Sequence, residues 1–240
     1  MQDPAQVHLR RRAAAHAVRK SLEGGVTKAT RLKASTQEER SEKSRQLILE
    51  SALKLFSHRG YGATSVQDIA ADAGLSKGNV YHHFPDKETI FRSLLDRYFL
   101  LMSEPQFPFN RALSEGTFPE NLENLGLAAR DMVSEYREYV ALIYVDVVEF
   151  EGAHVRQFYE DMAVRFDAFF KKHGMEDELQ SKLANGLSPI SAVMLATRIF
   201  MNYFSVEILF GVKDHFGMGT EDAISEISRI LRHGMLKPSP

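Results

Sequence analysis

The stretch that decides the fold covers residues 60–88 and reads GYGATSVQDIAADAGLSKGNVYHHFPDKE. Thr64 stands at the start of a short apolar stripe, and Gln67 follows three residues later, which is the spacing of a capping box at a helix N-terminus. Gly74 is predicted to end this helix, because glycine adopts the left-handed conformation readily. Ser76 is of a type that caps the next helix. Two short helices joined by a tight, glycine-containing turn make a helix-turn-helix.

The second helix of this motif is predicted to present polar side chains outward, while Val80 and Phe84 point to the core. Its N-terminal end suits the major groove of DNA, because Lys and Asn side chains match the edges of guanine and adenine. A glycine in this helix lets the backbone approach closely. Hydroxyl groups and a further lysine around the motif suit phosphates. The predicted DNA-binding residues are Thr64, Ser65, Lys77, Gly78, Asn79, Tyr81, His82 and Lys87.

Residues 45–92 resemble the DNA-binding domain of TetR-family transcriptional regulators. The resemblance covers about a fifth of the chain and is carried by an ungapped series: Ile48, Ala52, Leu55, Phe56, Gly60, Tyr61, Thr64–Ala70, Ala73–Phe84, Lys87 and Glu88. It implies that the helix from Lys77 is the recognition helix and that Tyr81 and Lys87 contact phosphate. It also implies that the rest of the chain is an all-helical ligand-binding and dimerisation domain.

The overall charge hides a division of the chain. Thirty Lys and Arg residues against 32 Asp and Glu residues give a net charge of −2. Residues 1–44 carry ten basic and five acidic side chains, a net +5, whereas residues 45–92 carry +1 and residues 93–240 carry −8. Such asymmetry indicates that the N-terminal part of the chain binds a polyanion and that the remainder has a different function. The helix-turn-helix domain is itself nearly neutral, so its positive charge must act locally.

We therefore predict three parts. Residues 1–44 form a basic, flexible N-terminal extension; residues 21–44 hold too few large apolar groups to offset the entropy of ordering, so we expect disorder or partial helix there. Residues 45–92 form a three-helix DNA-binding domain, and residues 93–240 form a ligand-binding and dimerisation domain, so the fold is all-α. The extension departs from the short N-terminus usual in the TetR family. It is either an additional DNA-contacting arm or the product of a misassigned start codon.

Beyond residue 92 every segment is predicted as helix. The main stretches are Leu122–Tyr139, Val140–Phe150, Val155–His173, Pro189–Phe210 and Thr220–His233. The second is rich in β-branched residues, but no strand is available to pair with it, so we predict a buried helix. The fourth is apolar almost all round, which indicates burial on more than one side.

Several classes of protein and of site are excluded or disfavoured. The chain has no Cys, which excludes disulfides, thiolate metal sites and Cys nucleophiles. No stretch reaches the roughly 18 uncharged apolar residues of a membrane span, so we expect a cytoplasmic protein with no membrane partner. Phosphate-binding and nucleophile-elbow motifs are absent, and we expect neither an enzyme nor a cofactor.

One sequence pattern leaves an alternative function open. Glu151 and His154 have the Glu-x-x-His spacing of di-iron helical bundles. Such sites need a second pair, which the chain lacks, so no metal is expected. A helical-bundle, metal-dependent oxidase remains an alternative, as does an activator or architectural DNA-binding protein without an inducer.

The main hypothesis is a homodimeric repressor of double-stranded operator DNA that a small, largely apolar effector releases. Aromatic and methionine side chains indicate an apolar, adaptable cavity, and the candidate lining is Phe99, Met102, Met132, Tyr136, Tyr144, Phe158, Met162, Phe166, Met201 and Phe204. The last two helices would form a four-helix contact across a two-fold axis. The candidate interface residues are Ala192, Leu195, Ile199, Ile224, Ile227 and Leu231.

Overall fold

The computed structural model describes residues 37–115, 118–184 and 186–236. These residues form helices, with one isolated bridge between Leu183 and Leu236 and no strand within the described ranges. The predicted all-α class is confirmed. The chain divides into two units after Ser41, and everything discussed below lies in the second unit, apart from the first turn of the first helix.

The N-terminal helices are α2 (Gln37–Arg59), α3 (Val66–Asp72), α4 (Lys77–His83) and α5 (Lys87–Leu101). They share one hydrophobic cluster, in which these side chains are completely buried: Ile48, Phe56, Ile69, Val80 and Phe91. Residues 37–44, predicted as part of the flexible extension, are the first turns of α2. The prediction for residues 1–36 lies outside the described residues.

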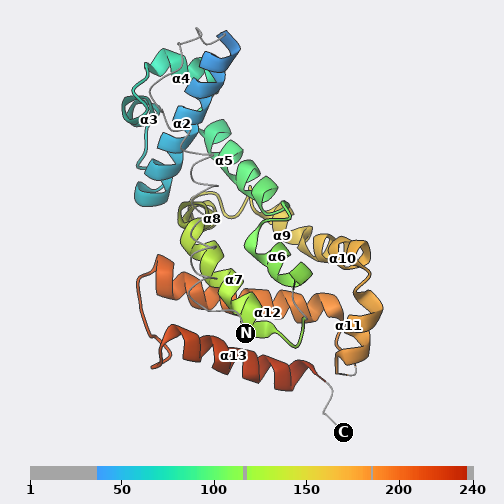
Figure 1. Ribbon diagram of the computed structural model, residues 1–240. Coiled ribbons are helices and arrows are strands. Elements are labelled where there is room, and N and C mark those ends of the chain that lie inside the picture. The colour runs from blue at the N-terminus through green and yellow to red at the C-terminus, as the bar shows by residue number, and fades with distance from the viewer. Residues whose placement is uncertain (1–36, 116–117, 185, 237–240) are drawn as a thin grey trace, which may run out of the picture. The chain divides into compact units, whose positions relative to one another are not determined.

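The body follows α5 and consists of α6 (Pro108–Glu115), α7 (Leu122–Glu135), α8 (Arg137–Glu149), α9 (Arg156–Glu160), α10 (Met162–His173), α11 (Glu176–Lys182), α12 (Pro189–Phe204), the π-helix η1 (Ser205–Leu209) and α13 (Thr220–Met235). Both α12 and α13 lie beside α7 (Figure 1). The body therefore packs around α7, which has neighbours from the far C-terminal part of the chain.

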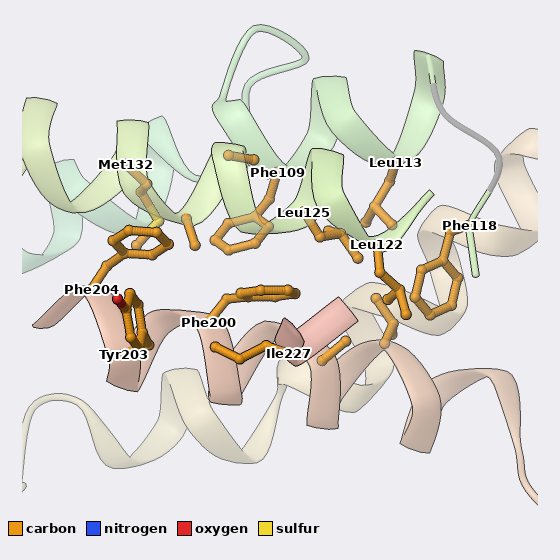
Figure 2. Close-up of a cluster of buried hydrophobic side chains, with 14 of the residues drawn as sticks. Phe109, Leu113, Phe118, Leu122, Leu125, Met132, Phe200, Tyr203, Phe204 and Ile227 are labelled. Atoms are coloured by element: carbon orange, nitrogen blue, oxygen red, sulfur yellow. The ribbon is translucent and has the colours of Figure 1, made fainter. Parts of the chain in front are cut away.

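The core of the body lies between α7 and α12. Figure 2 shows Leu125 and Met132 of α7 pointing toward Phe200 and Phe204 of α12. The helices approach closely at Gly126, where an added Cβ would lie 2.9 Å from Phe200 Cε1. A glycine is needed at this point because any side chain would push the two helices apart.

Two predicted helices are divided in the structure. Tyr136 separates α7 from α8 with backbone angles of φ −110° and ψ 27°, and Asp161 separates α9 from α10. The apolar spacing continues through both breaks, so the pattern does not reveal them. Gly174 ends α10 at φ 62°, as predicted. The stretch at 140–150 is helical as predicted, but it is not buried all round: Val147 and Val148 are 54% and 79% exposed.

The segment Pro189–Leu209 is the one stretch of described residues with the length and composition of a membrane crossing. Its apolar character has a reason in the fold, because Val193 and Phe200 are completely buried against the rest of the body. Leu195 and Ile199 point the other way and are 51% and 39% exposed. The sequence predicts that this segment is buried on more than one side, but within this chain only one of its sides is buried.

Candidate nucleic-acid interface

The first helix of the motif is capped one residue later than predicted. Ser65 Oγ accepts a hydrogen bond from Asp68 N (3.1 Å), and Asp68 Oδ2 accepts one from Ser65 N (2.9 Å), which makes a capping box. The Ser65 hydroxyl also donates to Asp68 Oδ2, and this hydrogen bond, together with the one from Ser65 N, holds the pKa of Asp68 below its usual value. Thr64, predicted as the cap with Gln67, is 1% exposed and donates its hydroxyl to Gly60 O (2.9 Å). The prediction of the cap was wrong by one position, because two adjacent hydroxyl residues fit the same pattern.

The turn between α3 and α4 is built as the sequence indicates. Gly74 has φ +67°, and Leu75 N donates to Ala70 O (2.9 Å) to close the turn. Ser76 then caps α4, because its Oγ accepts a hydrogen bond from Asn79 N (3.1 Å). These local bonds fix the direction of α4 relative to α3.

The outer face of α4 is polar and open. Val80 is completely buried and anchors the helix, whereas Lys77, Gly78 and His82 are exposed and Tyr81 is 47% exposed. Lys77 Nζ lies 5.8 Å from the centroid of the Tyr81 ring. The predicted contact residues of this helix therefore share one accessible face, with the aromatic ring supporting the ammonium group.

Asn79 and Gly78 lie in the middle of this face. Asn79 is half-buried, and its Oδ1 has no hydrogen-bond partner within the described part of the chain. At Gly78 an added Cβ would meet nothing closer than Ser76 Oγ, at 3.9 Å. The fold itself does not require glycine at this position. The bare backbone at Gly78 suits the close approach of a base edge, whereas Asn79 Oδ1 is buried and would have to turn outward to reach one.

Lys87 departs from the expectation of a phosphate contact. Its Nζ donates to Tyr61 O and Thr64 O, both at 2.8 Å, and lies 3.9 Å from the centroid of the Tyr61 ring. Burial lowers the pKa of Lys87. The ammonium group therefore anchors the turn before α3. Among the other predicted contacts, Ser65 is exposed, although its hydroxyl is engaged with Asp68.

Two of the predicted pocket residues, Phe99 and Tyr136, lie beside Tyr98, and a third, Phe158, stacks on Phe99. The rings of Phe99 and Phe158 stack with centroids 4.2 Å apart, and the Tyr136 centroid lies 6.0 Å from that of Tyr98. Tyr98 also stacks on Tyr139 at 5.2 Å. Tyr98 is 1% exposed, its hydroxyl has no hydrogen-bond partner in the described ranges, and burial raises the pKa of Tyr98. The sequence did not single this residue out as a ligand contact.

The other predicted pocket residues do not join this cluster as one lining. Met132 and Phe204 belong to the core, and Tyr144 is 39% exposed. The remaining four are half-buried: Met102, Met162, Phe166 and Met201. Two surface hollows of about 300 and 260 Å³ are lined by other residues, the first by Leu195, Arg198, Ile199, Asn202, Tyr203, His215 and Phe216.

The residues predicted for a dimer interface fall into two groups. Ala192, Ile224 and Ile227 are 0%, 2% and 5% exposed, because they complete the core of their own chain. The others lie nearer the surface: Leu195, Ile199 and Leu231. The surface available to a second subunit on these helices is therefore narrower than the sequence pattern predicts.

The Glu-x-x-His pair is not arranged around a metal. His154 Nδ1 lies 2.6 Å from Asp146 Oδ1, and His154 Nε2 lies 3.4 Å from Glu88 Oε1. Glu151 is exposed. In the part of the chain that the structure describes, no three potential ligands converge on one point. Both ring nitrogens of His154 instead face carboxylates that the sequence pattern did not connect with it.

Comparisons with known proteins agree with this geometry. Residues 48–94 match the family model for bacterial regulatory proteins, tetR family. The chain is 30% identical over 171 residues to the uncharacterized HTH-type transcriptional regulator YuxN of Bacillus subtilis, covering 66% of this chain and 56% of that protein. It is 35% identical over 107 residues to the HTH-type transcriptional repressor KstR2 of Mycolicibacterium smegmatis, covering 42% and 48%. The chain thus spans about half the length of the curated relatives it matches.

Solved structures share the fold. NalD, the secondary repressor of the MexAB-OprM multidrug efflux pump in Pseudomonas aeruginosa, superimposes with a TM-score of 0.59 at 20% identity, over 83% of this chain and 100% of that chain. The ketosteroid transcriptional regulator KstR2 of Mycobacterium tuberculosis gives a TM-score of 0.51 at 21% identity, over 81% and 95%. At such identities the likeness concerns the fold alone.

Proposed function

We propose that this chain, which belongs by its helix-turn-helix domain to the tetR family of bacterial regulatory proteins, is a homodimeric transcriptional repressor released from operator DNA by a small, largely apolar effector. The observation that carries this proposal is the open polar face of α4, held in place by the capped α3 and by the turn at Gly74. A regulator of this kind acts on DNA in the cytoplasm and catalyses no reaction.

In the proposed complex each subunit lays α4 in a major groove, with the half-sites about one helical turn or more apart. Lys77 and Asn79 read base edges, and Gly78 allows the close approach of the backbone. Tyr81, His82 and Ser65 lie where phosphates pass. Lys87 and Thr64 contribute indirectly, because their side chains hold the turn that precedes α3.

The test starts with selection of bound duplexes from a random library by the purified chain. Lys77→Ala should weaken binding to the selected duplex by about 1–3 kcal/mol and relax the base preference. Lys172→Ala is the matched control, because it removes the same charge from an exposed position on α10. If no sequence is enriched, or if both lysine variants bind alike, the assignment of α4 is overturned.

For the effector we propose a flat apolar molecule with one hydrogen-bond acceptor. The support is the aromatic cluster around Tyr98, whose buried hydroxyl has no partner among the described residues. A buried polar group without a partner costs stability, so it calls for an explanation. A donor held among aromatic rings would select a ligand that brings an acceptor to it.

Two compounds of similar shape distinguish binding that needs a hydrogen-bond acceptor from binding by apolar contact alone. The ketone 2-acetylnaphthalene should weaken DNA binding, and 2-ethylnaphthalene should do so at about tenfold higher concentration or not at all. Tyr98→Phe should abolish the difference and should itself raise the free energy of unfolding, because the orphan hydroxyl is gone. Equal action of both probes, or of neither, contradicts the proposed effector chemistry. Inaction of both also favours the alternative of a DNA-binding protein without an inducer.

The second subunit is proposed to cover the outward side of α12. Leu195 and Ile199 are exposed there, and they border the hollow of about 300 Å³ that Phe216 also lines. A single recognition helix reads few bases, and two-fold symmetry supplies the second half-site. Leu195→Asp combined with Ile199→Asp should give a monomer in light scattering. Val164→Asp on α10, which is 66% exposed, should stay dimeric.

A further inference from the structure

The turn before α3 receives a carboxylate from the body. Tyr61 N donates to Glu149 Oε1 (2.8 Å), and Gly62 N donates to Glu149 Oε2 (2.5 Å). An added Cβ at Gly60 would lie 2.7 Å from Oε1, and one at Gly62 would lie 3.0 Å from Oε2. Gly60 also has φ +86°. The turn is therefore shaped so that both oxygen atoms of one side chain reach adjacent N–H groups.

The same turn is held from its other side by Lys87. The carbonyl oxygens of Tyr61 and Thr64 accept hydrogen bonds from Lys87 Nζ. The N–H groups of the turn thus face a negative charge and its carbonyl groups face a positive one. Hydrogen bonds to charged groups are stronger than those between neutral groups. Removing either charge would therefore loosen the turn more than removing an ordinary hydrogen bond.

The segment after Glu149 adds contacts to α5. The Phe150 ring lies 4.5 Å from that of Tyr61 and 5.0 Å from that of Phe91. Asp146 is completely buried. Its Oδ2 accepts one hydrogen bond from Val155 N (3.2 Å), and its Oδ1 faces His154. The segment 146–155 therefore has a defined conformation of its own and presents Glu149 and Phe150 to the DNA-binding domain.

The segment also shares its core with the DNA-binding domain. Leu142 of α8 is completely buried and Val155 is 3% exposed, and both belong to the hydrophobic cluster of α2–α5. In the other direction, α8 contacts α7 and η1 of the body. A displacement of α8 would therefore act on the turn through side chains that are packed on both sides.

We propose that Glu149 is a positioning residue for DNA binding: its carboxylate fixes the Gly60–Gly62 turn, and with it α3 and α4, to helix α8. The proposal rests on the proposed function insofar as it concerns DNA. Glu149 itself does not touch DNA. Its loss should change how firmly the recognition helix is oriented without changing which bases that helix prefers.

The first test needs no DNA. Hydrogen–deuterium exchange of the Tyr61 and Gly62 amides is measured by mass spectrometry in wild type and in Glu149→Gln, whose amide offers one acceptor oxygen in place of two. We expect exchange at least about tenfold faster in Glu149→Gln. Glu160→Gln, the same neutralisation at an exposed position on α9, should leave these amides unchanged. Unchanged exchange in Glu149→Gln overturns the proposal. If that variant does not fold, Glu149→Asp, shorter by one methylene, is held to the same criterion.

The second test uses the duplex selected by the wild-type protein. Glu149→Gln should weaken binding about 5- to 20-fold with an unchanged base preference, whereas Lys77→Ala should change the preference. Faster exchange with unchanged DNA affinity would overturn the positioning role. If wild type binds no specific duplex, the proposed function fails, and the exchange result still decides whether Glu149 holds the turn.

Discussion

The helix-turn-helix and the body are held together in different ways. The ends of α3 and α4 are fixed by partners three residues apart, Ser65 with Asp68 and Ser76 with Asn79. The body is fixed by contacts between distant segments, as where α7 meets α12 and α13. A motif whose helix ends are fixed by local hydrogen bonds can keep a polar face open to a partner, while Lys87 and Glu149 hold the turn before it from more distant positions. A body held by packing has to fill its interior with large side chains.

The comparison predicts that the largest loss of stability comes from the body core. Phe200→Ala should lower the free energy of unfolding by about 3–5 kcal/mol, because Phe200 is completely buried between helices that local bonds do not hold together. Phe210→Ala, at a position 56% exposed, should cost less than about 1 kcal/mol. Urea unfolding followed by circular dichroism measures both. Equal losses would mean that the α7–α12 contact is not the main source of stability.

Substitutions of two lysines in the DNA-binding domain should distinguish a residue that stabilises the fold from a residue that binds DNA. Lys87→Ala should cost about 1.5–3 kcal/mol of unfolding free energy, since two carbonyl groups lose a charged donor. Lys77→Ala should leave thermal stability unchanged within about 0.5 kcal/mol, because Lys77 is exposed. Thermal denaturation of both variants is the measurement. Should Lys87→Ala melt like wild type while DNA binding falls uniformly across sequences, Lys87 would return to the role of a phosphate contact.

Two glycine-to-alanine substitutions test how closely the helices of the body approach each other. Gly126→Ala should destabilise by about 1–2 kcal/mol despite the better helix propensity of alanine, because its Cβ would lie 2.9 Å from Phe200 Cε1 and from Ile224 Cγ2. Gly234→Ala on α13 meets no atom within 4 Å and should stabilise by up to about 1 kcal/mol. Opposite signs in denaturant midpoints would support the close crossing. Stabilisation by both would show that the helices separate at little cost.

The same contrast explains what the sequence could predict. Gly74, Ser76 and the outward face of α4 follow from residue types and spacing, because their partners are near in sequence. The error in the cap, Thr64 in place of Ser65, arose between two neighbours that fit the same pattern. Helix class in the body also follows from periodicity, including the end of α10 at Gly174.

Contacts between residues that are far apart in the sequence leave no comparable pattern of residue types or spacing. Glu149 and Tyr61 are 88 positions apart, and neither the glycines nor the glutamate indicates the other. Ile224 reads as an interface residue on a helical pattern, yet it is 2% exposed inside its own chain. Periodicity shows that a face is apolar, but it does not say whether the same chain or a second one covers it.

The smallest predicted effect is the pH dependence of stability that His83 gives to the helix-turn-helix domain. Burial lowers the pKa of His83, and the nearby His82 and Arg45 lower it further. Above the unfolded-state pKa of about 6.5 the imidazole is neutral in both states, so stability is complete there. As the pH falls below that value the unfolded chain takes up the proton first, and stability is lost progressively until the folded-state pKa is passed.

His83→Gln should therefore flatten the pH dependence of the urea midpoint between pH 7 and the folded-state pKa of His83. His233→Gln, which removes an exposed imidazole from α13, should leave the wild-type dependence in place. A wild-type midpoint that rises on acidification would have the wrong sign for an imidazole whose pKa is lowered in the folded protein. The partial burial of His83 beside His82 and Arg45, on which this prediction depends, would then be incorrect, and charge would contribute more to the stability of the helix-turn-helix than its local hydrogen bonds suggest.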